Sequence, residues 1–415
     1  MTVPDLEIEA PALLRRPSFV RYWSARVSST VAFQMTAVVV GWQVYSLTGS
    51  TVELGLVGLM QFLPMLLLTI PAGHVADRYD RRIVVRICQM VEGCATALLA
   101  VGSYEGWLSV HVIFAAVAVL GACRTFESPT VSALLPGVVP LALLPSALAL
   151  SASATQTATI IGPALGGFLY VLGSASAYGT VAVLFFVSSV LVGGIAMARV
   201  TPRREPVTIE SLLSGFVYIR DHPIVLGAIS LDLFAVLLGG ATALLPVYAR
   251  DILHTSPIGL GLLRGAPAVG ALTTSILLAR HPLRRHVGLT MFAAVVVFGL
   301  ATIVFGLSTS FPLSLAALVL LGASDVVSVV IRGTLVQLET PDAMRGRVSA
   351  VNSMFIGTSN QLGEFESGMT AALLGTVPAV VVGGLGTIMV AVLWSRLFPS
   401  LRTVQRLDGD RSSAP

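Results

Sequence analysis

The sequence predicts an all-α membrane protein with twelve transmembrane helices in two six-helix halves. First, 55% of the 415 residues are hydrophobic and only 11% are charged, whereas soluble proteins carry about 25% charged residues. Second, the chain contains repeated apolar segments of about 20 residues, the length that crosses a bilayer as a helix. Third, features of the first half recur in the second half.

The apolar segments are too long for the strands of a membrane barrel, which need about 9–11 residues. Helices and closed barrels alone satisfy their backbone groups in lipid, so helices are favoured. The predicted spans are residues 20–46, 52–76, 83–102, 108–131, 145–172, 177–198, 224–249, 257–279, 287–307, 311–336, 347–374 and 376–397. These spans define a first half over residues 1–198, a linker over 199–223, a second half over 224–398 and a tail over 399–415.

The charged residues predict the orientation of the chain. All basic residues are Arg, and nearly all of those outside the spans fall on one side of the predicted topology. Basic residues favour the cytoplasmic side, so both termini are expected there. Residues 1–18 do not resemble a cleavable signal peptide, because no apolar core precedes the first span. The net charge of +4 is therefore interpreted as a topology signal and not as a nucleic-acid interface.

The linker is predicted to contain an amphipathic helix on the cytoplasmic face of the membrane. Its apolar stripe comprises Ile209, Leu212, Leu213, Phe216 and Ile219.

Weak matches at nearly constant spacing indicate an internal repeat. Val139-Pro140 corresponds to Thr340-Pro341, and Gly162 corresponds to Gly363, at an offset of 201 residues. Two halves with even numbers of spans share one orientation, and a substrate site is then expected where they meet, near the midplane.

The loop after the second span carries a recognisable motif. Gly73, Asp77, Arg78, Arg81 and Arg82 match the signature Gly-x-x-x-Asp-Arg-x-Gly-Arg-Arg. The chain therefore resembles the major facilitator superfamily, which implies the major facilitator fold.

Asp80 stands where that signature has Gly, which puts the tight turn in doubt. The resemblance implies that Asp77 acts as a conformational latch. It would bridge to the start of span 11 at Thr340-Pro341-Asp342, where Thr340 is expected to cap the helix. The alternative is that the loop charges only hold topology.

Span 5 contains small residues in a second motif, comprising Gly162, Pro163, Gly166 and Gly167. This motif resembles the core of the superfamily's antiporter motif, although the upstream glycines are missing. The alternative is close helix packing.

Ionisable residues inside spans are expensive and mark functional sites or partners. Two pairs share a helix face and are predicted to be structural ion pairs: Arg124 with Glu127, and Asp325 with Arg332.

A carboxyl group in a low-dielectric site can exchange a proton near neutral pH. Glu364 is the first candidate for proton coupling, Asp232 is the second, and Asp325 is a further candidate. The alternative is that Arg26 or Arg264 neutralises such a carboxylate for packing alone. Arg264 could equally attract an anionic substrate. The side chains expected to line the substrate cavity are Arg26, Gln34, Trp42, Gln43, Phe234, Arg264, Asn360 and Gln361.

Within the superfamily, the layout is similar to that of the bacterial drug and siderophore exporters, which include the enterobactin exporter. The resemblance rests on residues 76–79, the segment from Ser211 to Phe216, and the segment from Thr340 to Val348. It implies a monomeric, proton-coupled secondary transporter of the inner membrane that exports small amphiphilic molecules. A uniporter or importer and a non-transporting receptor or scaffold are the alternatives. No Walker or hydrolase motif and no metal-ligand spacing occur, so neither an enzyme nor a cofactor or metal is expected.

Overall fold

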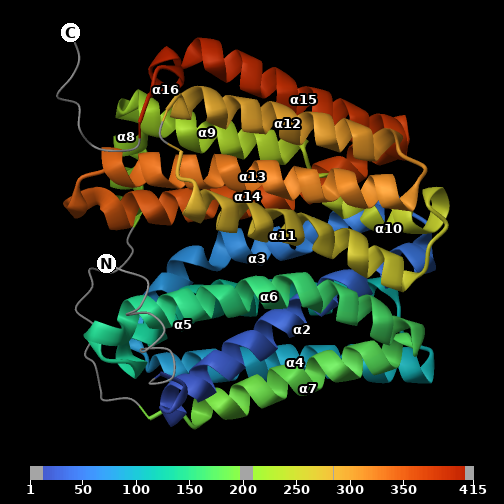
Figure 1. Cartoon of the computed structure of the whole chain (residues 1–415). Coiled ribbons are helices and arrows are strands. Elements are labelled where there is room, and N and C mark those ends of the chain that lie inside the picture. Colours follow the sequence, from blue (N-terminus) through green and yellow to red (C-terminus); the bar gives the residue numbers. More distant parts are fainter. Residues whose placement is uncertain (1–12, 197–208, 284, 407–415) are drawn as a thin grey trace. The chain divides into compact units, whose positions relative to one another are not determined.

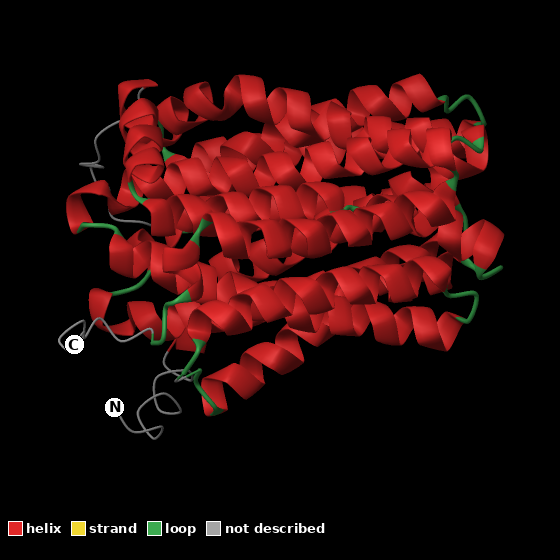
Figure 2. Ribbon diagram, turned by 90° about the horizontal axis from the view of Figure 1, so that it is seen from above, coloured by secondary structure: helices red, strands yellow, loops and turns green. Residues whose placement is uncertain are grey.

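The computed structural model describes residues 13–196, 209–283 and 285–406. Throughout these ranges the regular elements are helices, and none is a strand (Figures 1 and 2). The long helices are α2 (Pro17–Thr48), α3 (Thr51–Arg78), α4 (Arg81–Glu105), α5 (Val110–Val138), α6 (Leu144–Val171), α7 (Ser174–Gly193), α9 (Pro223–Leu238), α11 (Pro257–Arg280), α12 (Val287–Leu307), α13 (Phe311–Glu339), α14 (Asp342–Leu374) and α15 (Thr376–Leu397). The short elements are η1 (Leu141–Leu143), α8 (Ile209–Asp221), η2 (Ala241–Leu244), α10 (Leu245–Val247), η3 (Tyr248–Ile252) and α16 (Pro399–Arg402).

Ten segments of the described chain are long and apolar enough to cross a membrane. The predicted spans 5 and 11 form the long helices α6 and α14, which are not among the ten. In α14 the reason is composition, since its middle carries Asn360, Gln361, Glu364 and Glu366. The count of twelve spans therefore remains a prediction.

The helices group into two compact units. Unit 1 comprises Met1–Gly49, Met60–Val207 and Thr255–Gly265, and unit 2 comprises Ser50–Leu59, Thr208–His254 and Ala266–Pro415. The predicted halves differ from these units, because the first turns of α3 group with unit 2 and those of α11 group with unit 1. Much of the predicted linker, residues 199–208, lies outside the described residues.

In unit 1, α4 packs along α7 and α5, and α2 packs along α6 and α7. Small residues let α6 approach α2 closely. A Cβ atom added at Gly162 would lie 2.7 Å from the Cβ of Gln34, and one at Gly166 would lie 3.0 Å from the Cα of Met35. Gly162 and Gly166 thus lie at a tight contact with α2, whereas the buried Gly167 packs against Pro257 at the start of α11.

In unit 2, α12 packs between α13 and α15, and α9 packs against α14 and α15 (Figure 1). A single apolar cluster connects these helices. Its fully buried members include Leu231 on α9, Met291 on α12, Ile331 on α13 and Val348 on α14. This packing fixes the faces of α9, α12 and α13 toward one another.

The predicted span 7 is not one continuous α-helix. Helix α9 ends at Leu238, and the chain continues through η2 and α10 into η3, a π-helix. A Cβ atom at Gly240 would lie 2.6 Å from the Oγ of Ser367 and 2.7 Å from the carbonyl oxygen of Gly363. The interruption therefore packs directly on the middle of α14.

The predicted amphipathic segment forms α8, and its apolar residues differ in their exposure. Ile219 is buried in the core of unit 2, and a Cβ atom at Gly215 would lie 2.9 Å from the Arg347 carbonyl oxygen on α14. Leu213 and Phe216 are 56% and 48% exposed. The predicted helix therefore forms, with Ile219 at one edge of the stripe packed into unit 2, and its contact with the membrane face remains a prediction.

The two connections that the repeat predicts to correspond have similar backbone angles at their prolines, as proline favours, and the repeat itself remains a prediction. Pro140 has φ −59° and ψ 149°, and Pro341 has φ −58° and ψ 149°. Thr340 does not cap α14 as predicted, since its hydroxyl donates to the Val336 carbonyl oxygen at 2.5 Å and so closes α13. Helix α14 instead begins with Asp342, whose carboxylate pairs with Arg345 at 2.7 Å.

Candidate functional site

The signature loop joins α3, which ends at Arg78, to α4, which begins at Arg81. Asp80 is the N-cap of α4, and its Oδ1 accepts a hydrogen bond of 3.0 Å from the Arg82 backbone N–H. Its φ of −61° is accessible to any residue, so the absence of Gly at this position costs no strain. The turn that the sequence left in doubt is thus formed by a capping carboxylate.

The arginines of the loop are held by unit 1 itself. Arg81 donates to the Ala133 carbonyl oxygen at 2.9 Å, and Arg82 donates to the Ile195 carbonyl oxygen at 3.0 Å. Arg82 also pairs with Asp80 at 2.7 Å. Arg78 lies on the last turn of α3, and its Nη1 atom is 3.2 Å from Nε2 of His74. His74 directly follows Gly73, the first residue of the motif. The side chain of Asp77, the predicted latch residue, lies outside the described part of the structure.

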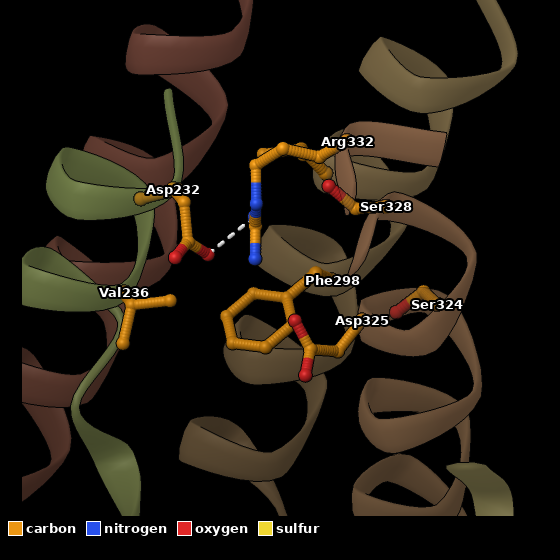
Figure 3. Close-up of a pocket in the computed structure, with 9 residues that line it drawn as sticks. Asp232, Val236, Phe298, Ser324, Asp325, Ser328 and Arg332 are labelled. Atoms are coloured by element: carbon orange, nitrogen blue, oxygen red, sulfur yellow. Dashed lines mark ion pairs between the residues drawn. The ribbon is translucent and has the colours of Figure 1, made fainter. Parts of the chain in front are cut away.

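A polar pocket lies inside unit 2 between α9, α12 and α13 (Figure 3). Asp232 comes from α9 and Phe298 from α12, while Asp325, Ser328 and Arg332 come from α13. The three α13 residues share one face because their spacing of three and seven residues follows the helical period. Neighbouring apolar packing fixes these faces, and the pocket is lined by Asp232, Ala235, Val236, Val295, Phe298, Ser324, Asp325, Ser328 and Arg332.

An ion pair joins two walls of this pocket. The Nη1 atom of Arg332 lies 2.5 Å from Oδ1 of Asp232, and the two side chains are 6% and 8% exposed. The sequence predicted Asp325 as the partner of Arg332, from their spacing on one helix. That prediction is wrong in the described structure, because Asp232 reaches across from α9 and takes the guanidinium.

Asp325 lies on the same pocket wall as Arg332, two turns earlier on α13 (Figure 3). The pocket thus holds two carboxyl groups and one guanidinium. If all three are ionised, one negative charge is in excess, and a low-dielectric site makes such a charge expensive. A proton on either carboxyl group would remove the excess.

The pocket is small. It leaves a volume of about 20 Å³ for the centres of water-sized molecules, which is room for one or two waters. Sites for drug-sized ligands are far larger. The geometry therefore suits a proton or a water molecule, and a larger substrate would need a different site.

The polar cluster predicted on span 11 lies on α14, also in unit 2. Glu366 accepts a hydrogen bond of 2.9 Å from the Thr370 hydroxyl. Asn360 is exposed and donates to the Ile356 carbonyl oxygen at 2.9 Å, while Gln361 and Glu364 are half-buried. A Cβ atom at Gly58 would lie 2.7 Å from the Cβ of Glu364.

The predicted cavity residues of unit 1 are engaged with neighbouring helices. Arg26 donates to the Thr155 hydroxyl at 3.1 Å. Gln43 is only 7% exposed and donates to Ser103 at 3.3 Å, which favours a structural role. Trp42 makes an edge contact with a tyrosine ring on α6, and Gln34 faces the glycine motif.

The two remaining predicted cavity residues lie on separate helices. Phe234 on α9 packs on Trp394, with ring centroids 5.2 Å apart. Arg264 on α11 is half-buried.

The second predicted pair lies in unit 1. Arg124 Nη1 is 3.5 Å from Glu127 Oε2, and the guanidinium also lies over the ring of Phe33 at 4.7 Å. Sequence reasoning missed Gln89, which donates to Glu127 at 2.8 Å from α4. A Gln on a buried face was the available signal, but spacing within one helix does not reveal a partner on another.

Residues 9–413 match the family model described as transmembrane secretion effector, MFS_3. The chain belongs to the major facilitator superfamily. This transporter is 29% identical to an enterobactin exporter, EntS, of Citrobacter koseri, over 94% of each chain. The resemblance predicted from the loop motif and the layout is confirmed.

Solved structures show that the fold of this transporter is shared with distant members. A bacterial homologue of the human lysosomal transporter Spinster has a TM-score of 0.72 at 14% identity, over 95% of this chain and 98% of that one. The nucleoside transporter NupG has a TM-score of 0.70 at 14% identity, over 92% of this chain and 99% of that one. At such identities, the likeness concerns the fold alone.

Proposed function

We propose that this transporter is a proton-coupled exporter of small amphiphilic molecules, such as drugs or siderophores, working by alternating access. The observation that carries the proposal is the pocket of Asp232, Arg332 and Asp325, where two carboxyl groups meet one guanidinium inside a helical unit. Ionisable groups in membrane spans mark ion pathways and proton relays. The similarity to an enterobactin exporter over 94% of the chain supports the direction of transport.

The pocket suggests how a proton would be used. Arg332 is bound to Asp232 while Asp325 carries a proton. Loss of that proton gives Arg332 a second carboxylate on its own helix, and the guanidinium is then shared between α9 and α13. Protonation thus changes the strength of the link between two helices, which is the two-state element that coupling requires.

Glu364, the first proton-coupling candidate from the sequence, is retained as a candidate after Asp325. It lies on α14 close to Gly58, on the helix that packs against the interrupted span. We further propose that α6 and α14 also cross the inner membrane, giving twelve spans with both termini in the cytoplasm. Residues 73–82 would serve as the latch.

The test is substrate-triggered proton flux in acid-loaded proteoliposomes, followed with a pH-sensitive dye. The panel contains cationic drugs and siderophore-like anions. Asp325→Asn is expected to abolish proton flux while retaining counterflow of the same compound, because exchange needs binding but no net proton movement. Ser324→Ala, the neighbouring pocket residue, is the matched control and should retain both.

Full coupled flux in Asp325→Asn would remove Asp325 from the mechanism. The same measurement on Glu364→Gln then decides whether that carboxyl group carries the proton. Counterflow without proton flux in the wild-type protein would instead indicate an uncoupled carrier.

A further inference from the structure

A second group of buried ionisable side chains lies in unit 1. Gln89 and Glu92 lie one turn apart on α4, and Glu127 lies on α5, the helix packed beside it. Each of the three side chains is 1% exposed. Gln89, one turn before Glu92, contacts Glu127 directly, which places the two carboxyl groups in one buried cluster.

Some buried polar atoms of this cluster have no hydrogen-bond partner. Gln89 donates one hydrogen bond of 2.8 Å to Oε1 of Glu127. Two acceptor atoms have no hydrogen-bond partner among the described residues, Oε1 of Gln89 and Oε2 of Glu92, while Oε2 of Glu127 has no hydrogen bond and only the Arg124 guanidinium at 3.5 Å. Buried acceptors normally have a donor, and each unmet one costs free energy. The cluster therefore has too few hydrogen-bond donors for its acceptors.

The cluster also has more acidic than basic side chains. Arg124 lies 3.5 Å from Glu127 but is 39% exposed and also stacks on Phe33. Helix α7, which also packs on α4, carries no acidic or basic side chain between Ser174 and Gly193. One guanidinium thus faces two carboxyl groups, and Glu92 has no cation of its own in the described structure.

The surroundings exclude water from one side. Cys88 and Cys123 lie four residues before Glu92 and Glu127, so they share the same helix faces one turn away. They form an apolar cluster with Val84, and all three are 8% exposed.

We propose that Glu92, with Glu127, Gln89 and Arg124, forms a second proton-binding site, in unit 1. A proton on Glu92 cancels the excess negative charge. It also converts a carboxyl oxygen into the donor that the neighbouring acceptors lack. Glu127 stays ionised beside Arg124 and Gln89. The site does not rest on the proposed export function, because it follows from the buried cluster alone.

The test is infrared difference spectroscopy of the purified, lipid-reconstituted protein without substrate, between acidic and alkaline buffers. A protonated carboxyl group gives its own C=O stretching band. The wild-type protein is expected to show such a band, and Glu92→Gln is expected to lose one component of it. Glu105→Gln, an exposed position at the end of the same helix, is the control and should leave the component assigned to Glu92 unchanged.

Glu92→Asp keeps a carboxyl group and should shift that component instead of removing it. This variant carries the test if Glu92→Gln does not fold, as judged by circular dichroism. An unchanged band in a folded Glu92→Gln or Glu92→Asp variant would overturn the proposal. So would a band lost on replacing choline with sodium at constant pH, because the cluster would then hold a cation.

Discussion

The buried pair of Asp232 and Arg332 allows a quantitative prediction. Both side chains are more than nine-tenths buried, and the charged atoms are 2.5 Å apart. Removing one partner of a buried ion pair costs about 3–5 kcal/mol, because the other charge is left uncompensated. Asp232→Asn should lower the free energy of unfolding by about 3 kcal/mol, since Asp325 remains to face Arg332. Arg332→Met should cost about 5 kcal/mol, since two carboxyl groups are left without a cation.

The double variant Asp232→Asn with Arg332→Met should be far more stable than the sum of the single losses implies. Replacing both members of a buried pair is often close to neutral. The interaction free energy from the cycle should therefore exceed about 2 kcal/mol. Equilibrium unfolding in mixed micelles with increasing dodecyl sulfate, followed by helical circular dichroism, measures all four proteins.

Two results would refute this reasoning. Additivity of the single losses within about 0.5 kcal/mol would mean that the two side chains do not interact. A larger loss for Asp232→Asn than for Arg332→Met would mean that Asp325 does not share the guanidinium.

Three further predictions concern packing, capping and pH. Gly162→Leu should destabilise the protein by about 1–3 kcal/mol in the same unfolding assay, because even its Cβ would lie 2.7 Å from an atom of α2. The control Gly179→Ala should not destabilise the protein, because its Cβ meets nothing within 4 Å. Equal losses in the two variants would contradict the close contact at Gly162. Asp80→Ala should cost about 1 kcal/mol through loss of the α4 cap, while Asp80→Gly should cost only a few tenths; equal costs would argue against capping. Burial, and then the charge of Glu339, raises the pKa of Tyr218, so the stability it contributes is present below the ordinary tyrosine pKa of about 10 and is lost as the pH rises above it. Tyr218→Phe should therefore flatten the alkaline loss of stability in unfolding measured against pH, and an unchanged slope would exclude this assignment.

The helical framework could be predicted from the sequence because lipid leaves few alternatives. Apolar runs of the right length mark α4, α12 and α15 within a few residues, and the charged loop marks the end of α3 at Arg78 and the start of α4 at Arg81. Hydropathy is weaker for α6 and α14, whose polar side chains lower the apolar signal.

The partners of the buried charges could not be predicted. Spacing along one helix indicated that Asp325 would pair with Arg332. In the structure Arg332 pairs instead with Asp232, which lies 100 positions earlier on α9, because α9 packs against α13. The same limit hid the contact between Gln89 and Glu127. Periodicity defines which residues share a face, and only the packing of helices defines what that face meets.

The capping aspartate at position 80 has a consequence for tracing this signature through evolution. Glycine serves a turn by tolerating many backbone conformations, whereas an aspartate with φ −61° serves the same turn by bonding to the following helix. The two residues are thus alternative solutions at one site, and a lineage can exchange them at little cost. In this chain the signature is carried by the spacing of the flanking aspartate and arginines, with no glycine between them.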